Sequence, residues 1–155
     1  MRWYDVRWYV QVLRRYADFR GRARRAEYWM FGLVSGIISA MLSLVDIGVL
    51  GFGLDTVMPF GGAGPLGWAY SLAVLVPTFA VGARRLHDLG RSGWWQSLDV
   101  PFMVGTTLKL DGVIGVVLLL GGMLLGLAVF IMLVLDGSPG PNRWGANPKA
   151  EARAG

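Results

Sequence analysis

The chain contains no cysteine and only one histidine among its 155 residues. The absence of cysteine excludes disulfides, thiolate catalysis and every cysteine-based metal site. One histidine is too few for the usual zinc ligand sets. The sequence also lacks the G-x-S-x-G turn of many hydrolases and the Walker A loop that cradles nucleotide phosphates. We therefore expect no metal, no cofactor, no catalytic residues of a recognisable type and no enzyme activity.

Charged residues are also scarce, at 16% of the chain, whereas apolar residues reach 54% and come in long blocks. A membrane-spanning helix needs ~20 apolar residues, and residues 28–50, 66–83 and 112–135 meet this requirement. Residues 92–109 form a shorter apolar block that contains Asp99 and a proline. This block either spans the membrane with a snorkelling lysine at its far side or forms a re-entrant or interfacial segment.

The amino-terminal residues 5–19 predict an amphipathic helix that is too polar to span. Its apolar side chains recur at spacings of three and four residues, which is typical of one helix face. We expect this helix to lie flat at the inner membrane surface; the alternative is a helix that packs on the rest of the protein. No apolar signal-peptide core precedes it, so we expect no cleavable signal peptide. The residues of the expected apolar face are Val6, Tyr9, Val10, Leu13, Tyr16 and Ala17.

The basic residues, which give a net charge of +5, orient these segments. Eight arginines precede the first apolar block, three lie between the second and third, and three basic residues follow the last. Only Lys109 would fall on the other side of a four-span protein. Because cytoplasmic loops carry an excess of lysine and arginine, this distribution favours four spans with both termini in the cytoplasm. The positive charge then orients the chain in the membrane and attracts anionic lipid, and we expect no nucleic-acid partner.

Three polar clusters fall on the cytoplasmic side of this topology. They are FRGRARRAEYW at residues 19–29, ARRLHDLGRSGWW at residues 83–95 and GSPGPNRWGANP at residues 137–148. In this order and at these membrane positions they resemble the bacterial inner-membrane family known as domain-of-unknown-function family 805, over residues 9–148. The resemblance implies a small multi-helix protein of the inner (plasma) membrane. It implies no particular reaction.

The first two clusters are expected to meet at the inner membrane surface. Glu27 would be costly beside the bilayer without a partner, so we expect an arginine of the second cluster to pair with it. Asp88 could pair with Arg84, four residues earlier on a helix face. The excess basic charge indicates a site for an anion or a lipid phosphate. The alternative is a salt-bridged loop that only locks the second and third spans together. The candidate binding residues are Arg24, Arg25, Arg84, Arg85, His87 and Arg91.

Within the apolar blocks, glycines spaced by four residues indicate close helix packing. Gly32 and Gly36 form one such pair, and Gly122 and Gly126 form another. They predict either packing within the protein or a homo-oligomer. Asp99 is the intramembrane polar candidate, because a charged side chain at that depth is by default a functional one.

The sequence therefore predicts one integral membrane domain over residues 1–155. It is an all-α polytopic helical bundle of four transmembrane helices plus the interfacial helix, with a cytoplasmic tail at residues 136–155. We expect a structural, scaffold or lipid-interacting protein whose partners are membrane lipids, preferentially anionic ones. The alternatives are a small transporter or channel subunit that acts as an oligomer, and a membrane enzyme that acts on lipid headgroups.

Overall fold

The computed structural model describes residues 5–53, 64–101 and 112–149. Within these ranges the regular elements are helices, apart from one isolated bridge in the tail. Three of the described helices are long and apolar enough to cross a membrane. The prediction of an all-α chain with membrane-length helices is confirmed, but three helices of this kind are found where four were expected. The elements are α1 (Arg7–Arg14), α2 (Arg25–Gly48), α3 (Gly64–Asp88), the 3-10 helix η2 (Gly93–Asp99) and α5 (Gly112–Val134).

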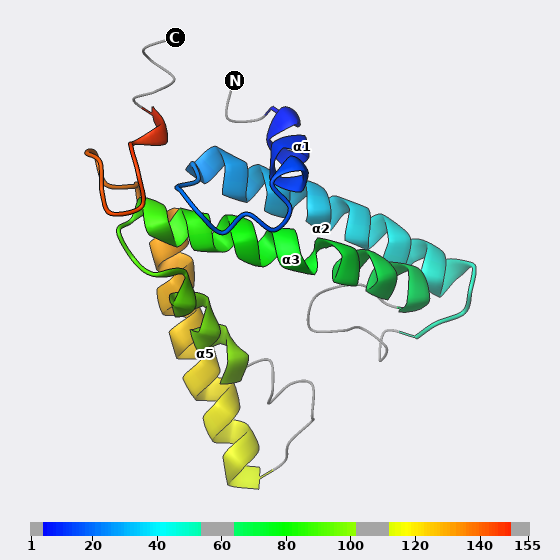
Figure 1. Cartoon of the computed structure of the whole chain (residues 1–155). Helices are drawn as coiled ribbons and strands as arrows, with labels where there is room; N and C mark the ends of the chain where they lie inside the picture. The colour runs from blue at the N-terminus through cyan, green and yellow to red at the C-terminus, as the bar shows by residue number, and fades with distance from the viewer. Residues whose placement is uncertain (1–4, 54–63, 102–111, 150–155) are drawn as a thin grey trace.

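The helices form two arms that share one end (Figure 1). α2 and α3 lie side by side and antiparallel, and the short α1 packs across them. α5 meets the carboxyl end of α3 and leads away from the α2–α3 pair, with η2 packed beside it. The start of α2, the end of α3 and the end of α5 consequently lie together, and the tail folds over this shared end. Polar residues from distant parts of the sequence are thereby brought to one place.

The opposite end of the α2–α3 pair is held by Asp46, which is fully buried. Its carboxylate accepts the backbone N–H groups of Leu66 at 3.2 Å and Gly67 at 2.8 Å. The first N–H groups of a helix have no partner within the helix, so Asp46 at the end of α2 caps the start of α3. Gly64 begins α3 with φ +78°, and a Cβ there would lie 2.9 Å from the Asp46 side chain. The cap therefore requires a glycine at this position.

The amino-terminal helix is shorter than predicted for residues 5–19. It ends at Arg14, because Arg15 leaves the helical backbone with φ −103° and ψ 42°. The guanidinium of Arg15 then donates to Asp18 at 2.9 Å, and the backbone N–H of Arg20 donates to the same carboxylate at 3.0 Å. These contacts build a turn in place of the last helical residues that the spacing indicated.

The face that α1 buries matches the predicted one only in part, because Tyr9 and Leu13 of that face pack against the core. Trp8 and Val12 are buried, whereas Val6 and Val10 are exposed. Val12 packs into an apolar cluster with residues of α2 and α3, so α1 is docked on the protein. That α1 lies at the inner membrane surface stays a prediction. The Tyr9 hydroxyl lies 3.1 Å from a tyrosine hydroxyl on α3. Burial, together with this neighbouring hydroxyl, raises the pKa of Tyr9 to about 12.

The end of α3 and the start of the third apolar block also differ from the predicted boundaries. α3 continues to Asp88, so the polar residues from Arg84 onward form its last turns and not the predicted loop. The third apolar block begins as η2, which no residue-spacing argument indicated. Residues 102–109 of that block lie outside the described part of the chain. α5 is almost uniformly apolar and largely exposed, as expected of a helix that faces lipid.

Candidate functional site

Charged and titratable residues gather at the shared end of the two arms, and six of them have almost no contact with solvent. They come from the segment before α2, the first turn of α2 and the last turns of α3. Each is at most 6% exposed. Buried charges are tolerated only where they are paired and hydrogen-bonded, so the partners of each one define this site. This buried polar cluster consists of Arg22, Glu27, Arg84, Arg85, His87 and Asp88.

The first ion pair of the cluster joins α2 to α3. Arg84 Nη1 lies 2.8 Å from Glu27 Oε1, and the two side chains are 0% and 4% exposed. The sequence predicted that Glu27 would take an arginine of the second cluster, and the structure places Arg84 there. Removing one partner of a buried pair leaves an uncompensated charge, which costs about 3–5 kcal/mol. The pair therefore ties the two helices together at this end.

The second ion pair is a carboxylate shared by two arginines. Asp88 accepts from Arg22 Nε at 2.9 Å through one oxygen and from Arg85 Nη1 through the other. The prediction that Asp88 would pair with Arg84 is wrong, because Arg84 turns to Glu27 and Arg85 lies one turn from Asp88 on the same helix. Gly137 packs directly on this carboxylate. A Cβ at Gly137 would lie 1.9 Å from Asp88 Oδ2, so the close approach requires a glycine.

The remaining guanidinium donors of Arg85 hold the end of α5. Arg85 Nε donates to the carbonyl of Leu133 at 3.2 Å, and Nη2 donates to the carbonyl of Leu135. The last carbonyl groups of a helix lack partners within it, and a cation near that end also opposes the helix dipole. Arg85 of α3 therefore acts as the carboxyl-terminal cap of α5.

Arg22 holds the tail in the same way. Its Nη1 donates to the carbonyl of Gly140 at 2.7 Å, and its Nη2 donates to the carbonyl of Ser138 at 2.7 Å. The backbone N–H of Ser138 in turn donates to the carbonyl of Asp88 at 2.9 Å. The segment before α2, the end of α3 and the tail are thus closed into one hydrogen-bonded unit.

His87 is enclosed by the tail and by the segment before α2. Its Nδ1 lies 3.1 Å from the carbonyl of Gly21, so Nδ1 carries the proton and donates. Its ring stacks on Trp144 with centroids 3.6 Å apart and planes 7° apart. Asn142 Nδ2 donates to the carbonyl of His87 at 2.9 Å. His87 therefore contacts the tail through the stacked ring of Trp144 and through Asn142, and it contacts the segment before α2 through Gly21.

The structure separates the candidate binding residues into three places. Arg84, Arg85 and His87 lie in the buried polar cluster, where Arg84 pairs with a carboxylate and the other two bind carbonyls. The Nη2 of Arg84 has no hydrogen-bond partner among the described residues. Arg24 and Arg25 lie outside it, at the start of α2, and line a cavity. Arg91 is exposed and lies over the ring of a tryptophan in η2.

The structure also shows what surrounds Asp99 and the two glycine pairs of the apolar blocks. Asp99 ends η2 and packs on α5, where a Cβ at Gly126 would lie 2.9 Å from its Oδ1. Gly122 is buried as well. Gly32 and Gly36 are instead open on α2, with nothing within 4 Å of an added Cβ. The two glycine pairs thus have different surroundings.

Sequence reasoning missed Arg22 and the tail as parts of one site. Arg22 precedes α2, so no helical spacing relates it to Asp88, 66 residues later. The tail contributes mostly backbone carbonyls, which leave no trace in residue type. The one available signal was that Arg22, Asp88 and Trp144 each lie in one of the three polar clusters of the sequence.

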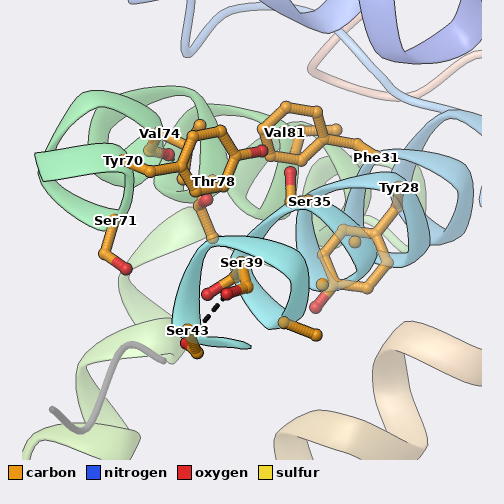
Figure 2. A pocket seen from close by; sticks show the side chains of 13 residues that line it. Tyr28, Phe31, Ser35, Ser39, Ser43, Tyr70, Ser71, Val74, Thr78 and Val81 are labelled. Atoms are coloured by element: carbon orange, nitrogen blue, oxygen red, sulfur yellow. Dashed lines mark hydrogen bonds between the residues drawn. The ribbon is translucent and has the colours of Figure 1, made fainter. Parts of the chain in front are cut away.

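Two cavities accompany the cluster. The hydroxyl groove, of about 460 Å³, lies between α2 and α3. Figure 2 shows Ser35, Ser39 and Ser43 along its α2 side and Tyr70 and Thr78 on its α3 side. The basic cavity, of about 690 Å³, lies at the start of α2 between α1 and the tail. Among the described residues, no three His, Asp or Glu side chains gather in a way that could hold a metal ion.

The buried polar cluster is better suited to holding segments of the chain together than to catalysing a reaction. Each of its two carboxylates is engaged by arginine, and its histidine is enclosed by backbone and by a tryptophan ring. A general base must reach a substrate proton, and neither carboxylate is free to do so in this arrangement.

Comparisons with known proteins agree with this picture. The family model described as "Protein of unknown function (DUF805)" matches residues 16–146. The inner membrane protein YhaH of Escherichia coli (strain K12) is 39% identical over 144 residues, which cover 93% of this chain and 98% of the relative. The inner membrane protein YhaI of the same strain is 37% identical over 145 residues, which cover 93% and 97%. No solved structure matches the chain significantly.

The family match spans the first two polar clusters, the third as far as residue 146, the α2–α3 pair and α5. Both relatives are inner membrane proteins, and neither name specifies a reaction. The chain therefore belongs to the DUF805 family of inner membrane proteins.

Proposed function

We propose that the chain is a non-catalytic structural protein of the inner membrane. In this proposal the buried polar cluster is a clamp that joins the α2–α3 pair to α5 and the tail. The observation that supports this proposal most directly is that Arg85 binds Asp88 on its own helix and the last carbonyls of α5 at the same time. A cluster whose charges were kept for a substrate would leave at least one of them accessible, whereas these arginines are fully buried.

The proposal includes four membrane crossings with both termini in the cytoplasm. The course of the chain supports an even number of crossings. α3 ends and α5 ends at the buried polar cluster, but α5 begins at its opposite end. The end of α3 at Asp88 and the start of α5 at Gly112 are therefore separated by the length of α5, a helix of 23 residues and about 34 Å. The positive-inside distribution assigns the cluster to the cytoplasmic side.

Distance measurements between the two arms test the clamp. The cysteine-free chain accepts spin labels at chosen sites, and Ile37 on α2 and Leu127 on α5 are both exposed. We expect a narrow distance distribution for the Ile37→Cys, Leu127→Cys pair and a broad one when Asp88→Ala is added. The matched control is Asp18→Ala, because Asp18 pairs with Arg15 outside the cluster. An unchanged distribution in the folded Asp88→Ala protein would refute the clamp.

A second candidate function is a transporter or channel subunit that acts as an oligomer. The observation that favours it is the hydroxyl groove, which presents serine and threonine hydroxyls on a membrane-length helix pair. Gly32 and Gly36 border this groove and are open to a neighbouring helix. Cross-linking between copies through Gly36→Cys, with Gly121→Cys on α5 as the control, tests this candidate. A monomer in lipid nanodiscs would count against it.

A further inference from the structure

The basic cavity at the start of α2 is separate from the buried polar cluster and its clamp. α1 contributes Trp8 to its wall, and the tail contributes Asp136 and Lys149. The rest of the wall comes from the first turns of α2. Its charged side chains remain accessible, since those of Arg25 and Lys149 are 42% and 52% exposed. Unlike the arginines of the cluster, these can meet a ligand.

The polar rim of this cavity favours an anion. Arg24, Arg25 and Lys149 supply three positive charges against the one carboxylate of Asp136. No side chain caps the start of α2, and the positive end of its dipole points to the same place. Arg24 is positioned by the ring of Trp8, 5.8 Å from its guanidinium carbon, and by the carbonyl of Pro148. The rim thus has two more positive than negative charges, and the contacts of Arg24 fix its position in part.

The remaining wall is apolar and follows α2 toward the membrane interior. Trp29, Met30 and Leu33 line it along α2. Leu33 lies eight residues beyond Arg25, which is about 12 Å along a helix. A free anion would use only the rim, whereas a phospholipid has a phosphate at one end and an acyl chain at this depth. Tryptophan is also the side chain enriched at the headgroup level of membranes.

We propose that the basic cavity binds one anionic phospholipid, with its phosphate between Arg25 and Lys149 and an acyl chain along Trp29 and Leu33. This site does not depend on the clamp, because none of its basic residues belongs to the buried polar cluster. Asp136 pairs with both cations, with Lys149 at 2.8 Å and with Arg25 at 3.3 Å. Lys149 and then Arg25 lower the pKa of Asp136, so it stays ionised. Asp136 therefore competes with the lipid phosphate for the same two cations.

Lipid titration of the purified full chain in detergent tests the proposal. Phosphatidylglycerol and phosphatidylcholine with identical acyl chains are compared with inorganic phosphate, and bound lipid is measured by native mass spectrometry. We expect phosphatidylglycerol to bind more tightly than phosphatidylcholine, and inorganic phosphate to compete only weakly. The double variant Arg25→Gln, Lys149→Gln should weaken phosphatidylglycerol binding by about 25-fold, on the order of fivefold for each basic residue at a membrane surface.

Two further variants sharpen the test. Asp136→Asn should strengthen phosphatidylglycerol binding, because it frees both cations from their competitor. Arg91→Gln removes one charge from an exposed site that does not line the cavity, and it should leave binding unchanged. The proposal is overturned if the double variant keeps its preference for phosphatidylglycerol or if Arg91→Gln loses as much binding. Equal binding of phosphatidylcholine, or full competition by inorganic phosphate, would likewise overturn it.

Discussion

The hydroxyl of Tyr16 donates to the backbone carbonyl of Ala73, the group that Pro77 leaves without its helical donor. A proline inside a helix has no N–H to offer the carbonyl four residues earlier. Within a membrane such a freed carbonyl needs another partner, and the segment that follows α1 supplies it. This contact explains how α3 tolerates a buried proline and why the amino-terminal segment lies against α3.

The Tyr16 contact predicts a double-mutant cycle. Tyr16→Phe should lower the free energy of unfolding by about 1 kcal/mol, the net worth of one hydrogen bond. Pro77→Ala restores the helical donor to Ala73, so Tyr16→Phe should cost much less in that background. Thermal unfolding in detergent measures all four proteins. Equal effects of Tyr16→Phe in both backgrounds would show that the hydroxyl acts elsewhere.

The Glu27–Arg84 pair predicts a large loss of stability with a specific rescue. Glu27→Ala should destabilise the protein by about 3–5 kcal/mol, because it leaves a buried arginine uncompensated. The double variant Glu27→Ala, Arg84→Met removes the orphaned charge and should recover part of that loss. Unfolding midpoints in detergent compare the two, with Asp18→Ala as the control for a partly exposed pair. A double variant that is less stable than Glu27→Ala contradicts the assignment.

Gly137 and Gly140 form a matched pair for testing the approach of the tail to Asp88. Gly137→Ala places a Cβ within 1.9 Å of the carboxylate oxygen, and we expect a loss of about 1–3 kcal/mol from overpacking. Gly140→Ala adds the same group where nothing lies within 4 Å, so its effect should be small. Thermal unfolding measures both variants. A tolerated Gly137→Ala would mean that the tail is not seated on Asp88.

Topology predicts opposite labelling of two engineered cysteines. Gly53 follows α2 and Ala146 lies in the tail, and both are exposed. In the four-crossing arrangement Gly53→Cys faces the periplasm and Ala146→Cys faces the cytoplasm. A membrane-impermeant thiol reagent on spheroplasts should therefore label Gly53→Cys alone, and Ala146→Cys should react only after lysis. The cysteine-free chain is its own background control. Labelling of both residues in intact spheroplasts would rule out the even number of crossings.

Several features of the candidate site were accessible to sequence reasoning because they depend on local chemistry. Glu27 beside an apolar block required an arginine, and the second cluster offered several. Which arginine it takes was not accessible. Arg84 and Arg85 are adjacent and chemically identical, and only the rotation of α3 against α2 sends one to Glu27 and the other to Asp88. The same rotation buries both, which removes them from the set of exposed anion-binding residues.

The sequence by itself determined the helical class and the apolar blocks, because burial in lipid demands long helices with few charges. Its three polar clusters also indicated the family. The tertiary structure decided which face of α1 is buried, the capping of α5 by Arg85 and the place of Arg22 beside Asp88. These outcomes depend on contacts between segments far apart in the chain, where guanidinium groups meet backbone carbonyls. Every residue carries such a carbonyl, so no pattern of side chains could reveal which ones would be bound.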